Sequence, residues 1–448
     1  MKSVGIDIGT TSISAVLLDA DRRMERSWTI QNPGFLASPH PWERLQDPNA
    51  IVESARGLLD SILDGEPEVG VVGLTGQMHG IVYLDGAGHA VSPLTTWQDM
   101  RASRPLPDGV SLCEAVQSRY GIKAYPGYGL MTHLYNAATG AVPALARGLA
   151  TIPDFFGMAL TGSAKPVLHS SNAASLGLYD LERHEWKRDI LDAFGEDGAI
   201  LPAVSNRYQL TGSYRGIPVG IAIGDNQASF LGSVRHSDEE ILINMGTGGQ
   251  ISLLSDRVLE AEEIETRPFN EDSYLVVGPS LCGGRAYAIL AGFFRACGEA
   301  FGCGESDPYA VMSRFLALPR EADPMQVRTT FDGTREHPGA RGGISNLSTD
   351  NFTPWGLTRG VLEGMAGELL ERYETMRRGL GLRRSRIIAS GNGLRRNPAL
   401  RQIAAEMFHM EVALSENTEE AACGAAMAGV IAAGLTTWEE AVGFRRRK

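Results

Sequence analysis

The sequence predicts an α/β protein made of two domains that share one plan. At 448 residues the chain is longer than a single hydrophobic core usually serves. Apolar strands alternate with helical segments, which is typical of α/β domains. A strand, a Gly-Thr bend and a second strand occur at residues 4–18 and again at residues 240–254. We therefore predict a divergent duplication, with one domain over residues 1–235 and the other over residues 236–448.

The opening hairpin places an acid inside an apolar strand. Asp7 lies in the middle of this strand, and a buried carboxylate is costly unless it has a partner. Gly9 ends the strand, and a turn of three hydroxyl residues follows: Thr10, Thr11 and Ser12. Backbone N–H groups and hydroxyls that face such an acid are suited to a metal-bound triphosphate.

The rest of the first half alternates between helix and strand. The spacing of apolar residues predicts a helix over residues 47–63, a buried strand over 69–74 and another strand over 80–84. Glycine and proline interrupt residues 105–150, which we expect to be irregular. We interpret residues 100–180, approximately, as an insertion or cap within the N-terminal domain.

The second half repeats this order. A strand over 218–223 precedes Asp225, the hairpin over 240–254 carries a Gly-Thr bend, and a strand over 386–390 ends in SGNGL. Helices are predicted over 357–380 and after Asn397, whereas residues 421–435 are typical of a short buried helix rather than a membrane span. Apolar strands that end in glycine are common in α/β proteins, so coincidence is the alternative to duplication.

Composition is that of an ordinary globular protein, with 43% hydrophobic and 21% charged residues. The formal net charge is −12, which disfavours nucleic-acid and anionic-membrane partners, and the basic run 445–448 reads as a solvated terminus. The five cysteines form no CxxC pair, and the N-terminus does not resemble a signal peptide. We expect a cytoplasmic protein with reduced thiols.

Asp225 is the candidate catalytic base. It follows an apolar strand and Gly224 at the start of a predicted helix. Phosphoryl transfer to an alcohol needs a carboxylate within hydrogen-bond reach of the hydroxyl, and the hairpin that starts at Glu240 would bring a phosphate near it. An aspartate in this position could equally be a simple N-cap.

Polar groups beside an aromatic ring indicate a polyol site. Gln77, Met78 and His79 follow one strand, and Trp97 and Asp99 belong to the TWQD segment. An indole ring stacks on the C–H faces of a sugar while polar groups bind its hydroxyls. A lone histidine is commonly structural and TWQD could be an ordinary turn. The nine histidines are dispersed along the sequence, so they do not indicate a metal site made of protein side chains. The expected metal is therefore Mg²⁺ that is held mostly by a nucleotide.

The SGNG segment is the candidate adenosine site. Gly391 and Asn392 are small enough for a base and ribose to lie against the backbone, and Asn397 caps the next helix. An ordinary strand-to-helix turn would look the same. The sequence contains neither a Walker loop nor a Rossmann fingerprint that opens a helix.

Seven short motifs occur in the order DIGTTS, GQMHG, TWQDMR, GDNQAS, MGTGG, SGNG and AACGAAMA. Together they resemble the FGGY carbohydrate kinases, relatives of actin and the 70-kDa heat-shock ATPases, along essentially the whole chain. The resemblance implies two duplicated actin/ribonuclease H-like domains with a cleft between them. It also implies that the N-terminal domain binds sugar, that the C-terminal domain binds ATP, and that domain closure excludes water.

The resemblance further implies roles for single residues. Asp225 matches the catalytic base, and Asp7 matches the acid that orders Mg²⁺ through water. The implied sugar-binding residues are Gln77, Met78, His79, Trp97, Asp99, Asp225 and Asn226. The implied ATP-binding residues are Thr10, Thr11, Ser12, Gly246, Thr247, Gly283, Gly284, Gly391, Asn392 and Asn397.

Two further segments resemble the sedoheptulokinase branch of this family, namely SSNAAS and PSLCGG. We therefore predict ATP-dependent phosphorylation of sedoheptulose to its 7-phosphate. The alternatives are conversion of xylulose to xylulose 5-phosphate, or another FGGY sugar or polyol kinase activity. Alternatives of another class are an actin-like conformational ATPase and an inactive sugar-binding regulator. The expected partners are a small-molecule sugar and ATP, with the oligomeric state, a homodimer included, left open.

Overall fold

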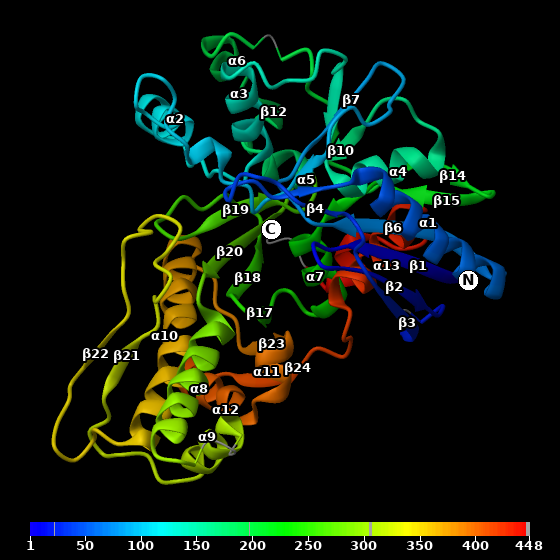
Figure 1. The fold of residues 1–448 in the computed structure, drawn as a ribbon. Helices are drawn as coiled ribbons and strands as arrows, with labels where there is room; N and C mark the ends of the chain where they lie inside the picture. Colours follow the sequence, from blue (N-terminus) through cyan, green and yellow to red (C-terminus); the bar gives the residue numbers. More distant parts are fainter. Residues whose placement is uncertain (22, 197, 304–306, 445–448) are drawn as a thin grey trace. The chain divides into compact units, whose positions relative to one another are not determined.

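The computed structural model describes the chain apart from residues 22, 197, 304–306 and 445–448, so the predicted basic terminus lies outside the described residues. The chain forms two compact units, which are described separately (Figure 1). Unit 1 comprises Met1–Gly232, Arg267–Ser273 and Glu419–Phe444, and unit 2 comprises Ser233–Thr266 and Tyr274–Thr418. Two later segments thus pack with the first half of the chain, which the expected division at residue 235 did not include.

A mixed sheet forms the centre of unit 1. Its order is β14–β15–β6–β1–β2–β3, with β16 also pairing with β6. The strands β1, β2 and β3 are antiparallel, whereas β6 is parallel to β1, and β15 and β16 are parallel to β6. The strands are β1 (Lys2–Ile8), β2 (Ser12–Leu18), β3 (Met24–Gln31), β6 (Val69–Gly76), β14 (Leu210–Tyr214), β15 (Ile217–Gly220) and β16 (Ile223–Gly224). The single strand expected over 218–223 is therefore divided in two.

Helices α1 (Pro48–Gly65) and α4 (Ile152–Thr161) pack on this sheet. The side chain of Asp47 accepts hydrogen bonds from two N–H groups of the first turn of α1, and Pro48 is its first residue. This start agrees with the helix expected over 47–63. The stripe that includes Ile51 and Leu59 is buried against β1 and β2, which anchors the strand that carries Asp7.

The region expected to be an insertion has its own apolar core and is more regular than predicted. Within residues 105–150, α2 (Leu112–Tyr120) begins at a capping box formed by Ser111 and Glu114, and α3 (Gly129–Ala138) follows. The smaller elements of unit 1, inside and outside this region, are β4 (Phe35–Leu36), β5 (Leu45–Gln46), β7 (Val82–Leu84), β8 (Leu94–Thr95), a 3₁₀ turn (Arg101–Ser103), β9 (Gly148–Ala150), β10 (Val167–His169), α5 (Ser170–Ser175), β11 (Tyr179–Asp180), β12 (Glu185–Trp186), α6 (Arg188–Ala193) and β13 (Ala203–Ser205).

The sheet of unit 2 has the order β19–β20–β18–β17–β23–β24. Its strands are β17 (Glu240–Met245), β18 (Gly249–Ser255), β19 (Glu265–Pro268), β20 (Tyr274–Ser280), β23 (Arg386–Ser390) and β24 (Glu411–Leu414). The helices are α8 (Gly283–Ala300), α9 (Pro308–Leu316), α10 (Pro354–Leu380), α11 (Asn392–Arg396) and α12 (Pro398–Phe408), and β21 (Gln326–Arg328) pairs with β22 (Gly343–Ser345).

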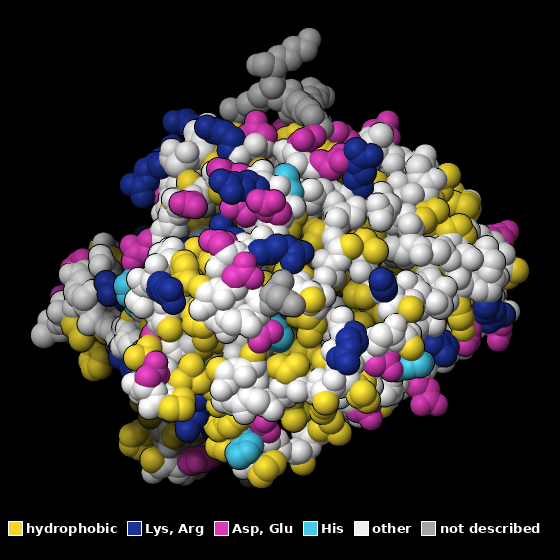
Figure 2. Space-filling model, turned by 90° about the horizontal axis from the view of Figure 1, so that it is seen from above, with side chains coloured by type: hydrophobic (Ala, Val, Ile, Leu, Met, Phe, Trp, Pro, Cys, Tyr) yellow, Lys and Arg dark blue, Asp and Glu magenta, His cyan; other side chains and the backbone are white. Residues whose placement is uncertain are grey.

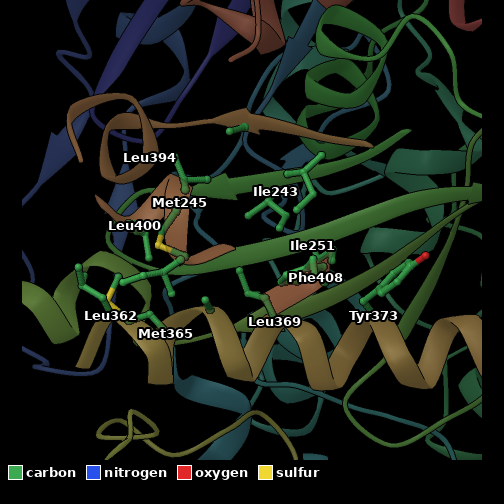
Figure 3. Packing of buried hydrophobic residues seen from close by; sticks show 14 of the residues in the cluster. Ile243, Met245, Ile251, Leu362, Met365, Leu369, Tyr373, Leu394, Leu400 and Phe408 are labelled. Carbon is green, nitrogen blue, oxygen red and sulfur yellow. The ribbon is translucent and has the colours of Figure 1, made fainter. Parts of the chain in front are cut away.

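The core of unit 2 lies between this sheet and α10 (Figure 3). Met365, Leu369 and Tyr373 recur on one face of α10, and the sticks of Figure 3 show this face directed at Ile243 and Ile251 of the hairpin. The spacing of three to four residues places these side chains on one stripe, as the sequence predicts. Their burial fixes the hairpin that bears the Gly-Thr bend.

The two sheets share one connectivity. In unit 1, β1 pairs antiparallel with β2 and parallel with β6. In unit 2, β17 pairs in the same way with β18 and β23. The strand that follows each hairpin in the sheet is β3 in unit 1 and β20 in unit 2. The strand beyond the parallel neighbour is β15 in unit 1 and β24 in unit 2. The structure thus confirms two α/β halves of like design.

Helix α13 (Glu420–Ala432) packs with unit 1 although it comes from the end of the chain (Figure 1). A Cβ atom at Gly5 would lie 1.9 Å from the carbonyl oxygen of Ala422, and one at Gly73 would lie 1.7 Å from that of Ala425. Only glycine allows the helix backbone to approach the sheet this closely. Helix α14 (Trp438–Val442) follows in the same unit.

The visible surface carries charges of both signs. On the face drawn in Figure 2, Lys and Arg side chains alternate with Asp and Glu rather than gathering in one field. Among the helices that the structure describes, none combines the length and apolar character needed to cross a membrane.

Candidate active site

Asp7 lies near two other carboxylates in unit 1. Burial raises the pKa of Asp7 to about 7, and the negative charges of Asp225 and Glu419 raise it further in the same direction. Glu419 directly precedes α13. Each of these two negative charges disfavours the ionised form of Asp7.

Asp225 is the first residue of α7 (Asp225–Ser233) and directly follows β16. Burial raises the pKa of Asp225, while the positive charge of Arg267 and hydrogen bonds from Asn226 oppose that shift. Asn226 donates from Nδ2 to Oδ1 of Asp225 over 2.6 Å. The carboxylate is therefore held in one orientation.

Thr10 joins the hydroxyl turn to two predicted sugar-binding residues. Its Oγ1 donates to Oε1 of Gln77 over 3.3 Å and accepts from Nε1 of Trp97 over 2.9 Å. Gln77 donates from Nε2 to Gln46 over 2.8 Å, and Gln46 donates to the backbone oxygen of Thr10 over 2.8 Å. These bonds close a ring that fixes the buried amide of Gln77. Trp97 is 45% exposed as a residue, so its indole can still stack on a ligand.

The remainder of the hydroxyl turn lies beside this ring. Thr11 is exposed, and Ser12 begins β2. The backbone oxygens of Gly9 and Thr11 accept hydrogen bonds from Asn32, which holds the turn in place.

His79 has a strained backbone and a fixed ring. Its φ of 75° lies in the left-handed region, which is uncommon for a residue with a side chain. The backbone N–H donates to Oγ of Ser175 over 3.1 Å, and Nδ1 lies 2.7 Å from the carbonyl oxygen of Ser175. Since a carbonyl only accepts, Nδ1 carries the proton. The imidazole stacks on Tyr128 with centroids 4.9 Å apart.

Met78 lies beside the residues that follow β16. Its sulfur is 3.6 Å from Nδ2 of Asn226, the amide that also donates to Asp225. The structure therefore brings Met78, Asn226 and Asp225 together, as the predicted sugar site requires.

Asp99 is fully buried and its carboxylate serves the protein itself. Oδ1 accepts from the backbone and Nε of Arg101, and Oδ2 accepts from Nη2 of Arg101 and the backbone N–H of Arg44. Four internal bonds leave this side chain no surface for a ligand. Its geometry corresponds to a support for the Trp97 segment rather than to the predicted direct contact.

A pocket of about 850 Å³ is formed within unit 2. Its lining includes five of the predicted ATP-binding residues: Gly246, Thr247, Gly284, Asn392 and Asn397. The rings of Tyr287 and Tyr309 also line it, 5.7 Å apart, and burial raises the pKa of Tyr287 to about 12. The pocket thus combines a glycine-rich bend with aromatic surface, which suits a flat base joined to a charged chain.

Gly283 and Gly391, the other predicted ATP-binding glycines, are close-packing positions. A Cβ at Gly283 would lie 2.4 Å from the carbonyl carbon of Gly248. Gly391 has a φ of 79°, and a Cβ there would lie 2.6 Å from the carbonyl oxygen of Met245. Both glycines therefore allow neighbouring segments to reach the Gly-Thr bend.

Several residues that the sequence did not single out belong to these sites. Gln46 completes the ring around Gln77, Arg267 acts on Asp225, and Arg285 lines the pocket of unit 2. Arg285 directly follows the Gly283–Gly284 pair, so its position offered a local signal. Gln46 and Arg267 offered none, because tertiary folding alone brings their segments to the site.

Comparison with known protein families matches each half of the chain to a domain of one family. The N-terminal domain of the FGGY family of carbohydrate kinases matches residues 3–232, and the C-terminal domain of that family matches residues 242–433. The two matches cover well over half of the chain and follow the order found here.

The chain is also similar to individual kinases. A sedoheptulokinase of Mus musculus is 26% identical over 95% of this chain and 96% of its own length. A xylulose kinase of Lactococcus lactis is 24% identical over 98% of this chain and 89% of its own. The crystal structure of a xylulose kinase from Rhodospirillum rubrum superposes with a TM-score of 0.82 at 22% identity, covering 99% of this chain and 92% of that one. The structural likeness confirms the predicted two-domain actin/ribonuclease H-like fold.

Proposed function

The chain belongs to the FGGY family of carbohydrate kinases, and we propose that it phosphorylates the terminal hydroxyl of a ketose, with sedoheptulose preferred. Members of this family are phosphotransferases that act on a sugar hydroxyl, which decides against the conformational-ATPase alternative. The observation that carries the proposal is the grouping of Asp225, Asn226 and Met78 within unit 1. It supplies a carboxylate beside groups suited to a polyol.

Asp225 is assigned the role of general base. As the sugar oxygen attacks the γ-phosphorus of ATP in line, the bond from that phosphorus to the bridging oxygen breaks, ADP leaves, and the proton of the sugar hydroxyl passes to the carboxylate of Asp225. The amide of Asn226 holds Oδ1, and burial raises the pKa of the carboxylate while the charge of Arg267 opposes that rise. A base must be ionised at the working pH to accept this proton.

His79 and Trp97 are assigned direct contacts with the sugar, and Gln77 an adjacent supporting contact. The ring of His79 is held by Ser175 and Tyr128, so a ligand would not have to order it. Trp97 offers an exposed indole face, with its N–H bound to Thr10. We assign Asp99 the role of fixing Arg101 and the TWQD segment.

The family implies ATP as the phosphoryl donor, and we assign it to the pocket of unit 2. Asn392 and Asn397 would face the adenosine, and Gly246 and Thr247 would face the phosphates. The described residues that line the pocket include two arginines and no carboxylate, which suits a polyanion. Arg285 is the arginine next to the Gly-Thr bend: its backbone N–H donates to the backbone oxygen of Thr247 over 3.0 Å, and its guanidinium pairs with Asp332 over 3.2 Å.

Mg²⁺ fits this chain as a companion of the nucleotide. In the part of the chain that the structure describes, no group of three or more His, Cys, Asp or Glu side chains is arranged to hold a metal ion. Mg²⁺ needs only one or two carboxylates when phosphates supply the other oxygens. Burial and the negative charges of Asp225 and Glu419 disfavour the ionised form of Asp7, and a cation beside Asp7 would stabilise that form. Bound there, Mg²⁺ would neutralise charge on the phosphates.

The preference for sedoheptulose is supported by the sedoheptulokinase relatives, which are 26% and 24% identical. A xylulose kinase relative at 24% identity supports the second candidate, xylulose. Initial rates with sedoheptulose, xylulose, ribulose and glycerol would separate them. We expect the highest kcat/KM for sedoheptulose. A tenfold advantage of xylulose would refute the preferred substrate, and no activity with any sugar or polyol would refute the kinase proposal.

A further inference from the structure

The strand end that precedes Asp225 is held by buried side chains on both of its last residues. Oγ1 of Thr75 donates to the carbonyl oxygen of Ile223 over 2.7 Å. The N–H of Gly224 donates to Oγ of Ser171 over 2.9 Å. Thr75 and Ser171 are both completely buried, so water cannot replace either bond.

The residue before these two is held in the same way. Nδ2 of Asn172 donates to the carbonyl oxygen of Ala222 over 3.2 Å and to Oδ2 of Asp154 over 3.1 Å. Oγ1 of Thr151 also donates to Oδ2 of Asp154, over 2.5 Å. Three consecutive residues before the proposed base are thus each bound by a different side chain.

Ser171 is itself anchored. The N–H of Ser171 donates to Nδ1 of His169 over 3.2 Å, and its hydroxyl lies 2.8 Å from the same nitrogen. Because Nδ1 accepts the backbone N–H, it carries no proton and can also accept from the hydroxyl. Burial lowers the pKa of His169 to about 3, which keeps this arrangement across the physiological range. The hydroxyl oxygen of Ser171 is then free to accept from Gly224.

Helix α5 also reaches the proposed sugar site. Ser171 and Asn172 lie at its start, and Ser175 at its end binds both the backbone N–H and the imidazole of His79. Oγ of Ser175 donates in turn to the backbone oxygen of Asn172 over 2.7 Å. One buried six-residue helix therefore connects a proposed sugar contact with the strand that bears the proposed base.

We propose that Thr75, Ser171 and Asn172 are positioning residues for phosphoryl transfer, which fix the backbone of β16 and so the placement of Asp225. This inference rests on the proposed role of Asp225 as the base. A base acts only within hydrogen-bond reach of the hydroxyl, and displacement by about 1 Å can reduce a rate about a hundredfold. The bonds hold the backbone and leave the carboxylate itself to meet the substrate.

Thr75 allows a test that conserves shape. Thr75→Val replaces the hydroxyl by a methyl group, and Thr75→Ser keeps the hydroxyl. We expect Thr75→Val to lower kcat about tenfold or more, with KM for ketose and ATP within about twofold of wild type, and Thr75→Ser to retain most of the activity. Equal loss in both variants, or no loss in Thr75→Val, would overturn the proposal.

Two neighbouring serines provide a matched pair. Ser171→Ala removes the acceptor for Gly224, and Ser170→Ala removes a buried hydroxyl for which the described structure contains no hydrogen-bond partner. Both changes delete one oxygen from the same helix. A selective loss of kcat in Ser171→Ala is expected, whereas equal kcat in the two variants would contradict a positioning role. If Thr75→Val does not fold, the comparison of Ser171→Ala with Ser170→Ala still tests the positioning role.

A double-mutant cycle with Asp225→Asn separates the positioning role of Thr75 from the base role of Asp225. If Thr75 acts through Asp225, adding Thr75→Val to Asp225→Asn should cause less than a twofold further loss. If the two losses multiply, the positioning role is refuted while the base assignment stands. If Asp225→Asn alone keeps wild-type turnover, the base assignment fails first.

Discussion

Replacement of Asp7 by Asn should stabilise the nucleotide-free protein at alkaline pH. The pKa of Asp7 is raised from its ordinary value of 3.8 to about 7. The folded protein therefore binds this proton more tightly than the unfolded chain does. The stabilisation of the folded protein by the proton on Asp7 is complete below about pH 4 and is lost as the pH rises through about 7. A difference of about 3 pH units, at about 1.4 kcal/mol per unit, gives an upper limit of about 4 kcal/mol.

The assay is equilibrium urea unfolding of wild type and Asp7→Asn at pH 5 and pH 8, without nucleotide or divalent cation. The unfolding free energy of Asp7→Asn minus that of wild type should rise by about 2–4 kcal/mol from pH 5 to pH 8, because the wild type must bury a charged carboxylate at pH 8 and Asn has no charge to bury. Asp21→Asn, a change at an exposed acid beyond the end of β2, is the matched control and should show no such gain. An equal difference between wild type and Asp7→Asn at both pH values would refute the electrostatic description of this site.

Three further outcomes follow from the geometry. Trp97→Phe removes the donor to Thr10 and should raise KM for the ketose about fivefold, since a neutral hydrogen bond contributes about 1 kcal/mol; an unchanged KM would show that the bond to Thr10 does not contribute to sugar binding. Arg285→Gln should raise KM for ATP about tenfold and leave KM for the ketose unchanged, as expected for a charged contact; equal effects on both would point to a folding defect. Gly73→Ala would place a Cβ 1.7 Å from the oxygen of Ala425 and should cost about 1–3 kcal/mol in unfolding free energy, whereas the exposed helical change Gly57→Ala should not destabilise.

Local signals in the sequence predicted most of the elements. Asn397 accepts from the N–H of Leu400, and Pro398 opens α12, as a cap followed by proline indicates. The apolar stripe of α10 and the hairpin of β17 and β18 also lie where periodicity placed them. These features depend on neighbouring residues, so a single sequence contains them.

The assignment of α13 to unit 1 could not be read locally. Its residues are small and apolar, which predicts a buried helix but not the sheet that buries it. The determining positions are Gly5 and Gly73, which lie hundreds of residues earlier in the chain and admit the helix backbone. The boundary near residue 235, which rests on the repeated hairpin pattern, therefore does not include this segment in the first unit.

The candidate site was predictable where single residues carry the chemistry. Asp225 and Asn226 are brought together with Met78, as their motifs indicated. The sequence predicts Asp99 as a sugar contact because polar groups beside Trp97 suit a polyol, but its carboxylate accepts hydrogen bonds from Arg101 and from the backbone of Arg44. Burial of that kind depends on partners that the motif does not contain.

The stoichiometry of ATP use with sedoheptulose, compared between wild type and Asp225→Asn, tests the kinase activity and the base role of Asp225 together. We predict one ADP formed per sedoheptulose phosphate, with no comparable ATP consumption when the ketose is omitted. Asp225→Asn should lower kcat about 10²–10⁴-fold, the usual contribution of a positioned base, while direct binding of ATP stays at the wild-type level. ATP hydrolysis at the same rate with and without the ketose would contradict the proposed ketose kinase activity, and unchanged turnover in a folded Asp225→Asn variant would contradict the role of Asp225 as base.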